Sequence, residues 1–76
     1  MPHIDIKCYP KHLTDAQFND FIHDVTQLMQ KHLHVAESDL SINYTEVSDG
    51  AWKQEVWDKE IAPNMDHLAK KPGYQM

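Results

Sequence analysis

The feature that most constrains the fold is a long run of apolar residues at helical spacing, which opens with a strong start signal at Thr14. The stretch Thr14-Asp15-Ala16-Gln17 has the form of a capping box, in which the threonine and glutamine side chains each accept a hydrogen bond from the other's backbone N–H group. The apolar side chains that follow recur every three or four residues, which predicts one amphipathic helix ending near His32–His34. The members of this core-facing stripe are Phe18, Phe21, Ile22, Val25, Leu28, Met29 and Leu33.

Two alternating segments flank this helix. The first runs from His3 to Cys8 and the second from Leu40 to Val47, and in each the apolar side chains fall on every second residue. This period of two is typical of a half-buried strand. Because a strand, a helix and a strand form a β-α-β unit, the two strands should be parallel, with a right-handed crossover. We therefore predict an α/β (α+β) fold with short C-terminal helices and a single domain spanning residues 1–76.

The C-terminal part is expected to contain two short helices. Pro63 separates them, because proline has no N–H group to donate within a helix, and the second covers residues 64–71. In an α-helix, Trp57 would lie on a different face from Trp52. A chain of 76 residues has little material for a large core, so we expect oligomerisation to complete the sheet. The apolar side chains of the first short helix are Trp52, Val56, Trp57 and Ile61.

Composition excludes several classes of partner. The chain has a net charge of −5, which makes a nucleic-acid partner improbable. It has no apolar run long enough to span a membrane and no signal-peptide pattern, so we expect a cytoplasmic protein without a membrane partner. The single cysteine, Cys8, fits a reducing compartment. No arginine is present, so an anionic ligand must be held by lysine, histidine, a polar side chain or backbone N–H groups.

Pro2 follows the initiator methionine, which is normally removed before a small residue such as proline. Its nitrogen would then be a secondary amine, unlike the non-basic amides of the rest of the backbone. An ordinary α-amino group titrates near ~8, and apolar surroundings lower that pKa toward neutrality. A base with such a pKa is suited to moving protons at physiological pH. Pro2 is therefore a candidate catalytic residue.

The six histidines do not indicate a metal site. His32 and His34, two residues apart at a helix end, do not point to one side, and no nearby cysteine or carboxylate completes a set of four ligands. Cys8 is expected on the core side of its strand, which argues against a role as nucleophile. We expect no metal.

Taken together, these segments resemble the tautomerase superfamily in its 4-oxalocrotonate tautomerase-type branch. The resemblance is carried by Pro2 at the start of the first strand, the Thr14–Gln17 helix start, Thr45-Glu46 near the end of the second strand, and Gly50-Ala51-Trp52. It covers roughly residues 2 to 57. The first eight residues and the Lys70–Tyr74 tail are similar to a subgroup of small bacterial tautomerases.

The resemblance implies a cofactor-independent keto-enol tautomerase that acts on 2-keto/2-hydroxy-enoic acids. Pro2 would be the general base, taking the enol proton and returning it to carbon. The family pairs its β-α-β units across subunits, so that a neighbouring chain lines part of each pocket. We expect a homo-oligomer, and prefer a homodimer to a hexamer because the C-terminal helices cover surface that shorter relatives use for assembly.

The sequence departs from the family pattern at the substrate anion site. The best-known members hold a dicarboxylate with two arginines, whereas the corresponding positions here offer Lys11 or His12 in the first loop and Ser41 in the second strand. This loss, together with Trp52 in the pocket, favours a mono-acid such as phenylpyruvate enol. Two alternatives remain open: a hydratase or dehalogenase that uses protonated Pro2, and a non-catalytic binding or assembly module of the same fold.

Overall fold

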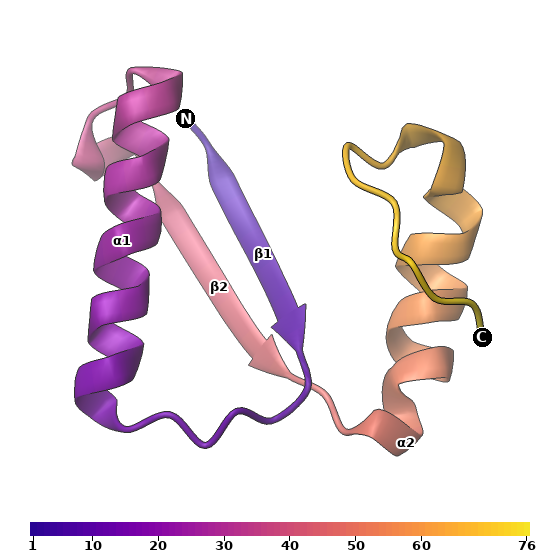
Figure 1. Ribbon diagram of the computed structural model, residues 1–76. Helices are drawn as coiled ribbons and strands as arrows, with labels where there is room; N and C mark the ends of the chain where they lie inside the picture. Colours follow the sequence, from indigo (N-terminus) through magenta and orange to yellow (C-terminus); the bar gives the residue numbers. More distant parts are fainter.

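The β-α-β unit predicted from the sequence is present in the computed structural model, which describes residues Met1 to Met76 (Figure 1). The strands β1 and β2 are parallel, and their register runs from His3 opposite Ser41 to Cys8 opposite Glu46. The prediction of two parallel strands is therefore confirmed. In chain order, the elements are β1 (His3–Cys8), α1 (Asp15–Leu33), η1 (Glu37–Asp39), β2 (Ser41–Glu46), α2 (Asp49–Trp52), η2 (Lys53–Ile61) and η3 (Ala62–His67).

Helix α1 begins and ends as its sequence predicts. The Thr14 Oγ1 atom accepts a hydrogen bond from the Gln17 N–H at 3.1 Å, and the Gln17 side chain accepts one from the Thr14 N–H at 3.0 Å. The helix ends at Leu33, and the residue that caps it, His34, has left-handed backbone geometry and donates its N–H to the Gln30 carbonyl. Phe18 and Phe21 meet the Tyr44 ring of β2 edge-on, with centroids 5.0 and 6.1 Å apart. The apolar stripe of α1 thus packs on one face of the sheet.

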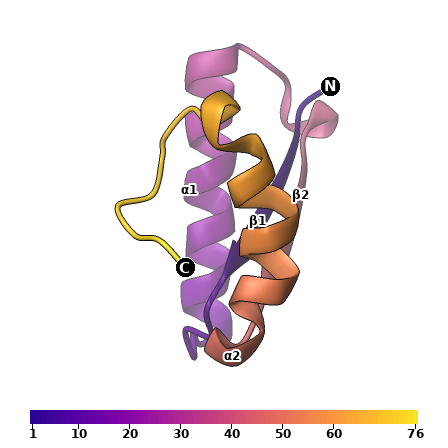
Figure 2. The ribbon, with the colours of Figure 1, turned by 90° about the vertical axis from the view of Figure 1, so that its right-hand side faces the viewer.

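The C-terminal segment forms a third layer on the opposite face of the sheet. Figures 1 and 2 show the two strands between α1 on one side and the α2–η2–η3 segment on the other. Element η2 is a π-helix of nine residues, in which the N–H of residue 62 bonds to the Trp57 carbonyl, five residues earlier. The wider turn brings Trp52 and Trp57 toward the same neighbour, Tyr74.

The helix predicted for residues 64–71 is also wrong. The segment Ala62–His67 is a short 3₁₀ helix, and Leu68 already has extended backbone. Pro63 is accommodated in the first turn, where its missing N–H costs nothing. The Asn64 side chain instead donates to the Glu60 carbonyl at 2.9 Å, and its own backbone leaves helical geometry. This side-chain bond competes with continuation of the helix.

A single chain leaves much of its apolar surface uncovered. Its accessible area is 5899 Å², whereas a compact monomer of 8.9 kDa exposes about 4,800 Å². Its radius of gyration is 14.3 Å, against about 11.4 Å for a compact domain of this length. Both strands have an unpaired edge. These quantities favour association with further chains. Only three residues are buried: Val47, Val56 and Trp57.

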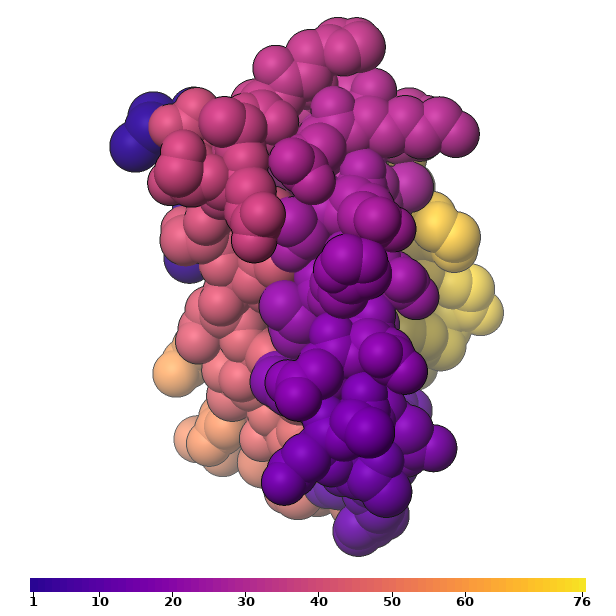
Figure 3. All heavy atoms as spheres, turned by 90° about the vertical axis from the view of Figure 1, so that its left-hand side faces the viewer, coloured from indigo at the N-terminus to yellow at the C-terminus, as the bar shows by residue number.

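The outer face of the molecule is formed by α1 over its full length, with β2 beside it (Figure 3). Leu28 and Leu33 of this helix are more than half exposed, and Phe21 is 36% exposed. No helix of the chain has the length and apolar character needed to cross a bilayer.

Candidate active site

Pro2 lies at the N-terminal end of the sheet, directly before β1. Its carbonyl oxygen accepts a hydrogen bond from the Ser41 N–H at 3.2 Å, which fixes the residue beside the first position of β2. Pro2 itself is half-buried, whereas Met1 is 96% exposed and extends into solvent. The fold thus holds the proline in place while it leaves the preceding methionine open to removal.

Ser41 is the one other predicted site residue that the structure places beside Pro2. Its Oγ atom lies 2.6 Å from the Nδ1 atom of His3, the residue opposite it in the parallel register. Both side chains are exposed and lie on the face of the sheet opposite α1. The sequence analysis named Ser41 but not His3, although strand alternation and the register would have paired them.

Lys11, His12 and Trp52 lie at the opposite end of the same sheet. Lys11 and His12 follow the C-terminal end of β1, and Trp52 packs edge-on against Tyr9 in that region, with ring centroids 5.1 Å apart. Six residues of extended strand separate the two ends by about 20 Å. Within one chain, therefore, the predicted site residues divide into two groups, one containing Pro2 and Ser41 and the other Lys11, His12 and Trp52.

An apolar hollow surrounds Trp52. The Trp52 Nε1–H group donates to the Tyr74 hydroxyl at 3.1 Å, and the Tyr74 ring also lies against Trp57, with centroids 5.4 Å apart. The hollow has a volume of about 480 Å³, within the range of small-ligand pockets. It is lined by Tyr9, Trp52, Tyr74, Gln75 and Met76. The contribution of the tail is a tertiary contact that local sequence spacing does not indicate.

Glu46, at the end of β2, organises the loop that carries Lys11. Its Oε2 atom accepts hydrogen bonds from the Lys11 backbone N–H at 3.1 Å and from the Tyr44 hydroxyl at 2.9 Å. These two donors hold the pKa of the Glu46 carboxyl below its usual value. The Cys8 thiol donates to the Tyr44 hydroxyl at 3.3 Å. The pKa of this hydroxyl is raised by the neighbouring Cys8, by desolvation and by the hydrogen bond that Tyr44 donates to Glu46. Sequence reasoning noted Thr45-Glu46 but missed this network.

Replacing Glu46 with glutamine should destabilise the protein at neutral pH and have little effect in acid. A carboxyl whose folded-state pKa is lowered contributes stability above its unfolded value of 4.5, and that contribution is lost as the pH falls through the folded pKa. Urea unfolding at about pH 7 and about pH 3 measures the difference. Glu55→Gln is the matched control, because Glu55 is exposed and its side chain makes no hydrogen bond. A deficit for Glu46→Gln that is equally large at both pH values would contradict this assignment.

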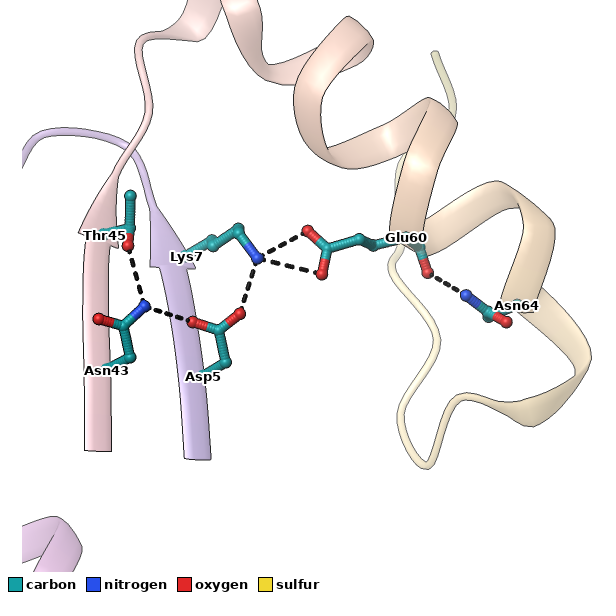
Figure 4. Close-up of polar contacts among 6 residues, drawn as sticks. All are labelled: Asp5, Lys7, Asn43, Thr45, Glu60 and Asn64. Carbon is teal, nitrogen blue, oxygen red and sulfur yellow. Dashed lines mark hydrogen bonds and ion pairs between the residues drawn. The ribbon is translucent and has the colours of Figure 1, made fainter. Parts of the chain in front are cut away.

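A polar network joins the face of the sheet opposite α1 to η2 (Figure 4). The Lys7 ammonium lies 2.7 Å from Asp5 and 2.8 Å from Glu60, and the Asn43 amide donates to Asp5 at 3.0 Å. Its hydrogen bond with Asp5 raises the pKa of Lys7, and the same bond lowers the pKa of Asp5. Two carboxylates therefore satisfy this lysine, which leaves it poorly suited to bind a further anion.

Comparison with known proteins places the chain in a family. No family model matches the chain. It is 51% identical to a protein named Tautomerase PptA from Cronobacter sakazakii, with all 76 residues of this chain and the whole of the relative covered. Relatives of the same name from Klebsiella pneumoniae and Escherichia coli are 51% and 45% identical, again over the full length of both chains. The resemblance to small bacterial tautomerases is thus confirmed.

Proposed function

Because the chain belongs to the PptA family of tautomerases, we propose that it catalyses keto-enol proton transfer in 2-keto/2-hydroxy-enoic acids, with Pro2 as the general base after Met1 is removed. The observation that carries this proposal is the placement of Pro2: half-buried, bonded through its carbonyl to Ser41, and preceded by a methionine that is 96% exposed. The test is ultraviolet-monitored ketonisation of phenylpyruvate enol by the wild-type protein and Pro2→Ala.

The chemistry requires one base and no redox step. The Pro2 nitrogen takes the proton from the enol hydroxyl at C2, the C2–C3 π electrons bond to a proton at C3, and C2 becomes the ketone carbon. The proton lost from oxygen and the proton gained by carbon balance, so a single amine serves both transfers. A neutral amine is needed, and contact with apolar surfaces favours the neutral form.

A site shared between two chains reconciles this chemistry with the geometry. Pro2 is about 20 Å from the end of the sheet that carries Trp52, so one chain does not bring both to one substrate. A two-fold dimer places the N-terminal end of one unit beside the C-terminal end of its partner and pairs free strand edges. The Lys7–Glu60 contact holds η2 over the other sheet face, which favours a homodimer over a hexamer built by stacking that face. With its single free cysteine, Cys8, the protein fits the cytoplasm.

The substrate class follows from the lack of arginine and from the hollow at Trp52. Four of the five residues that line this hollow are hydrophobic, and three of them, Tyr9, Trp52 and Tyr74, are aromatic. An aryl ring fits such a lining, whereas a second carboxylate would be buried without a charged partner. The enol of an arylpyruvate has one carboxylate and one ring, and it matches both features. These observations support an arylpyruvate enol over a dicarboxylate.

We expect kcat/KM for phenylpyruvate enol to exceed that for 2-hydroxymuconate, a dicarboxylate enol, by about a hundredfold or more. A charge-assisted hydrogen bond contributes about 1.5–3 kcal/mol, so a second carboxylate without such partners forfeits one or two tenfold steps per bond. Ketonisation of both enols under one set of conditions measures the ratio. Equal values for the two substrates would contradict the preference for a mono-acid, but they would not bear on the role of Pro2 as general base.

A further inference from the structure

The carboxylate of a 2-hydroxy-enoate is attached to the carbon that bears the enol hydroxyl. The group that binds this carboxylate must therefore lie within a few bond lengths of the base that removes the hydroxyl proton. In the chain that supplies Pro2, Lys11 and His12 lie about 20 Å away, beyond the other end of β1. Ser41 lies next to Pro2 regardless of how a partner docks, because its N–H bonds to the Pro2 carbonyl.

The state of His3 decides what the Ser41 hydroxyl can donate to. Only one proton fits between the Nδ1 and Oγ atoms, which are 2.6 Å apart. When Nδ1 is unprotonated, it accepts a hydrogen bond from the Ser41 hydroxyl, which then cannot donate to a bound anion. When Nδ1 carries a proton, it donates to Ser41 Oγ, and the Ser41 O–H is free to donate to an anion.

Among the strand residues on this face of the sheet, His3 is the one cation-forming side chain that no carboxylate holds. Lys7, on the same strand face, is bound by Asp5 and Glu60. Asp5, the carboxylate nearest to His3 along this face, is in turn bound by Lys7 and Asn43. From η2, the charged group that reaches this face is Glu60, and it is paired with Lys7. Helix α1 packs on the opposite face and contributes no charge here.

We propose that His3 and Ser41 form the carboxylate-binding pair of the site, in which the His3 imidazole orients the Ser41 hydroxyl and the hydroxyl donates a hydrogen bond to the substrate carboxylate. This proposal rests on the proposed function of Pro2. It assigns His3 as a positioning residue, and it gives the enzyme an anion site without arginine.

Two measurements test the pair. The first is KM and kcat for phenylpyruvate enol near neutral pH, compared between the wild-type protein and variants of the pair. Ser41→Ala should raise KM about tenfold or more, as expected for loss of a hydrogen bond to a charged group, with a much smaller change in kcat. Ser41→Thr keeps the hydroxyl and should restore KM. His3→Ala should also raise KM with a much smaller change in kcat, and it should add little in a Ser41→Ala background, because the imidazole acts through that hydroxyl.

The second measurement is binding of 3-phenylpropionate, which has the ring and carboxylate but no enol, followed by tryptophan fluorescence. It is made in the wild-type and Pro2→Ala backgrounds, so that carboxylate binding is read without turnover. Thr45→Ala is the matched control, because this hydroxyl lies on the same face of β2 at its far end and bonds to Asn43. Unchanged affinity in Ser41→Ala, or affinity lost in Lys11→Ala in its place, would overturn the pair. Full turnover by Pro2→Ala would overturn the proposed base alone.

Discussion

Replacing Pro2 with alanine is expected to lower kcat/KM for phenylpyruvate enol by at least about a hundredfold, since a positioned general base contributes about 10²- to 10⁴-fold. Alanine leaves a primary amine on a flexible terminus, whereas the proline ring fixes the direction of a secondary amine. The rate is followed by the ultraviolet absorbance of the enol near neutral pH. Both proteins must first be confirmed by intact mass to lack Met1.

A chain that keeps Met1 is the sharpest control for this result. It has every side chain of the active protein, but its Pro2 nitrogen is an amide without a basic lone pair. This form should therefore be as inactive as Pro2→Ala, although its fold is unchanged. Near-background rates for all three proteins would contradict the assignment of Pro2 as the general base and would favour a non-catalytic role for the protein. Equal, high rates would place the base elsewhere in the site.

The local elements were predictable because their signals are local. The capping box at Thr14 and Gln17 forms both of its hydrogen bonds, and the alternation from His3 to Cys8 matches the observed strand residue for residue. The C-terminal segment was less predictable, because its geometry depends on tertiary contacts. The run of apolar residues after Trp52 predicts an α-helix. In the structure, Tyr74 contacts both tryptophans, and the backbone between them adopts wider π turns.

The site was harder to predict than the fold, because the sequence does not state which chain supplies each residue. Resemblance grouped Pro2, Lys11, His12, Ser41 and Trp52 into one site, whereas the structure separates them along the length of β1. The network around Glu46 was missed for a related reason. Its role depends on the Lys11 N–H and the Tyr44 hydroxyl, which reach it from a loop and from the strand face.

Mixing two deficient variants should restore activity if the site is shared between chains. Pro2→Ala lacks the base. Trp52→Ala loses an aromatic wall of the pocket, so the substrate ring is less well buried and kcat/KM should fall about tenfold. In a mixed dimer, one of the two sites joins the intact Pro2 of one chain to the intact Trp52 of its partner. Because half of the dimers in an equal mixture are mixed, activity should approach about a quarter of the wild-type value.

The reciprocal mixture separates a shared site from a site within one chain. When wild-type protein is mixed with the double variant Pro2→Ala/Trp52→Ala, neither site of a mixed dimer is intact, so activity should fall to about a quarter. A site confined to one chain would leave half of the activity, and the first mixture would then show only the mean of its two parents. Co-expression of differently tagged chains allows exchange, and a solution mass of two protomers of 8.9 kDa confirms the dimer on which the count depends. A mass near six protomers would contradict it.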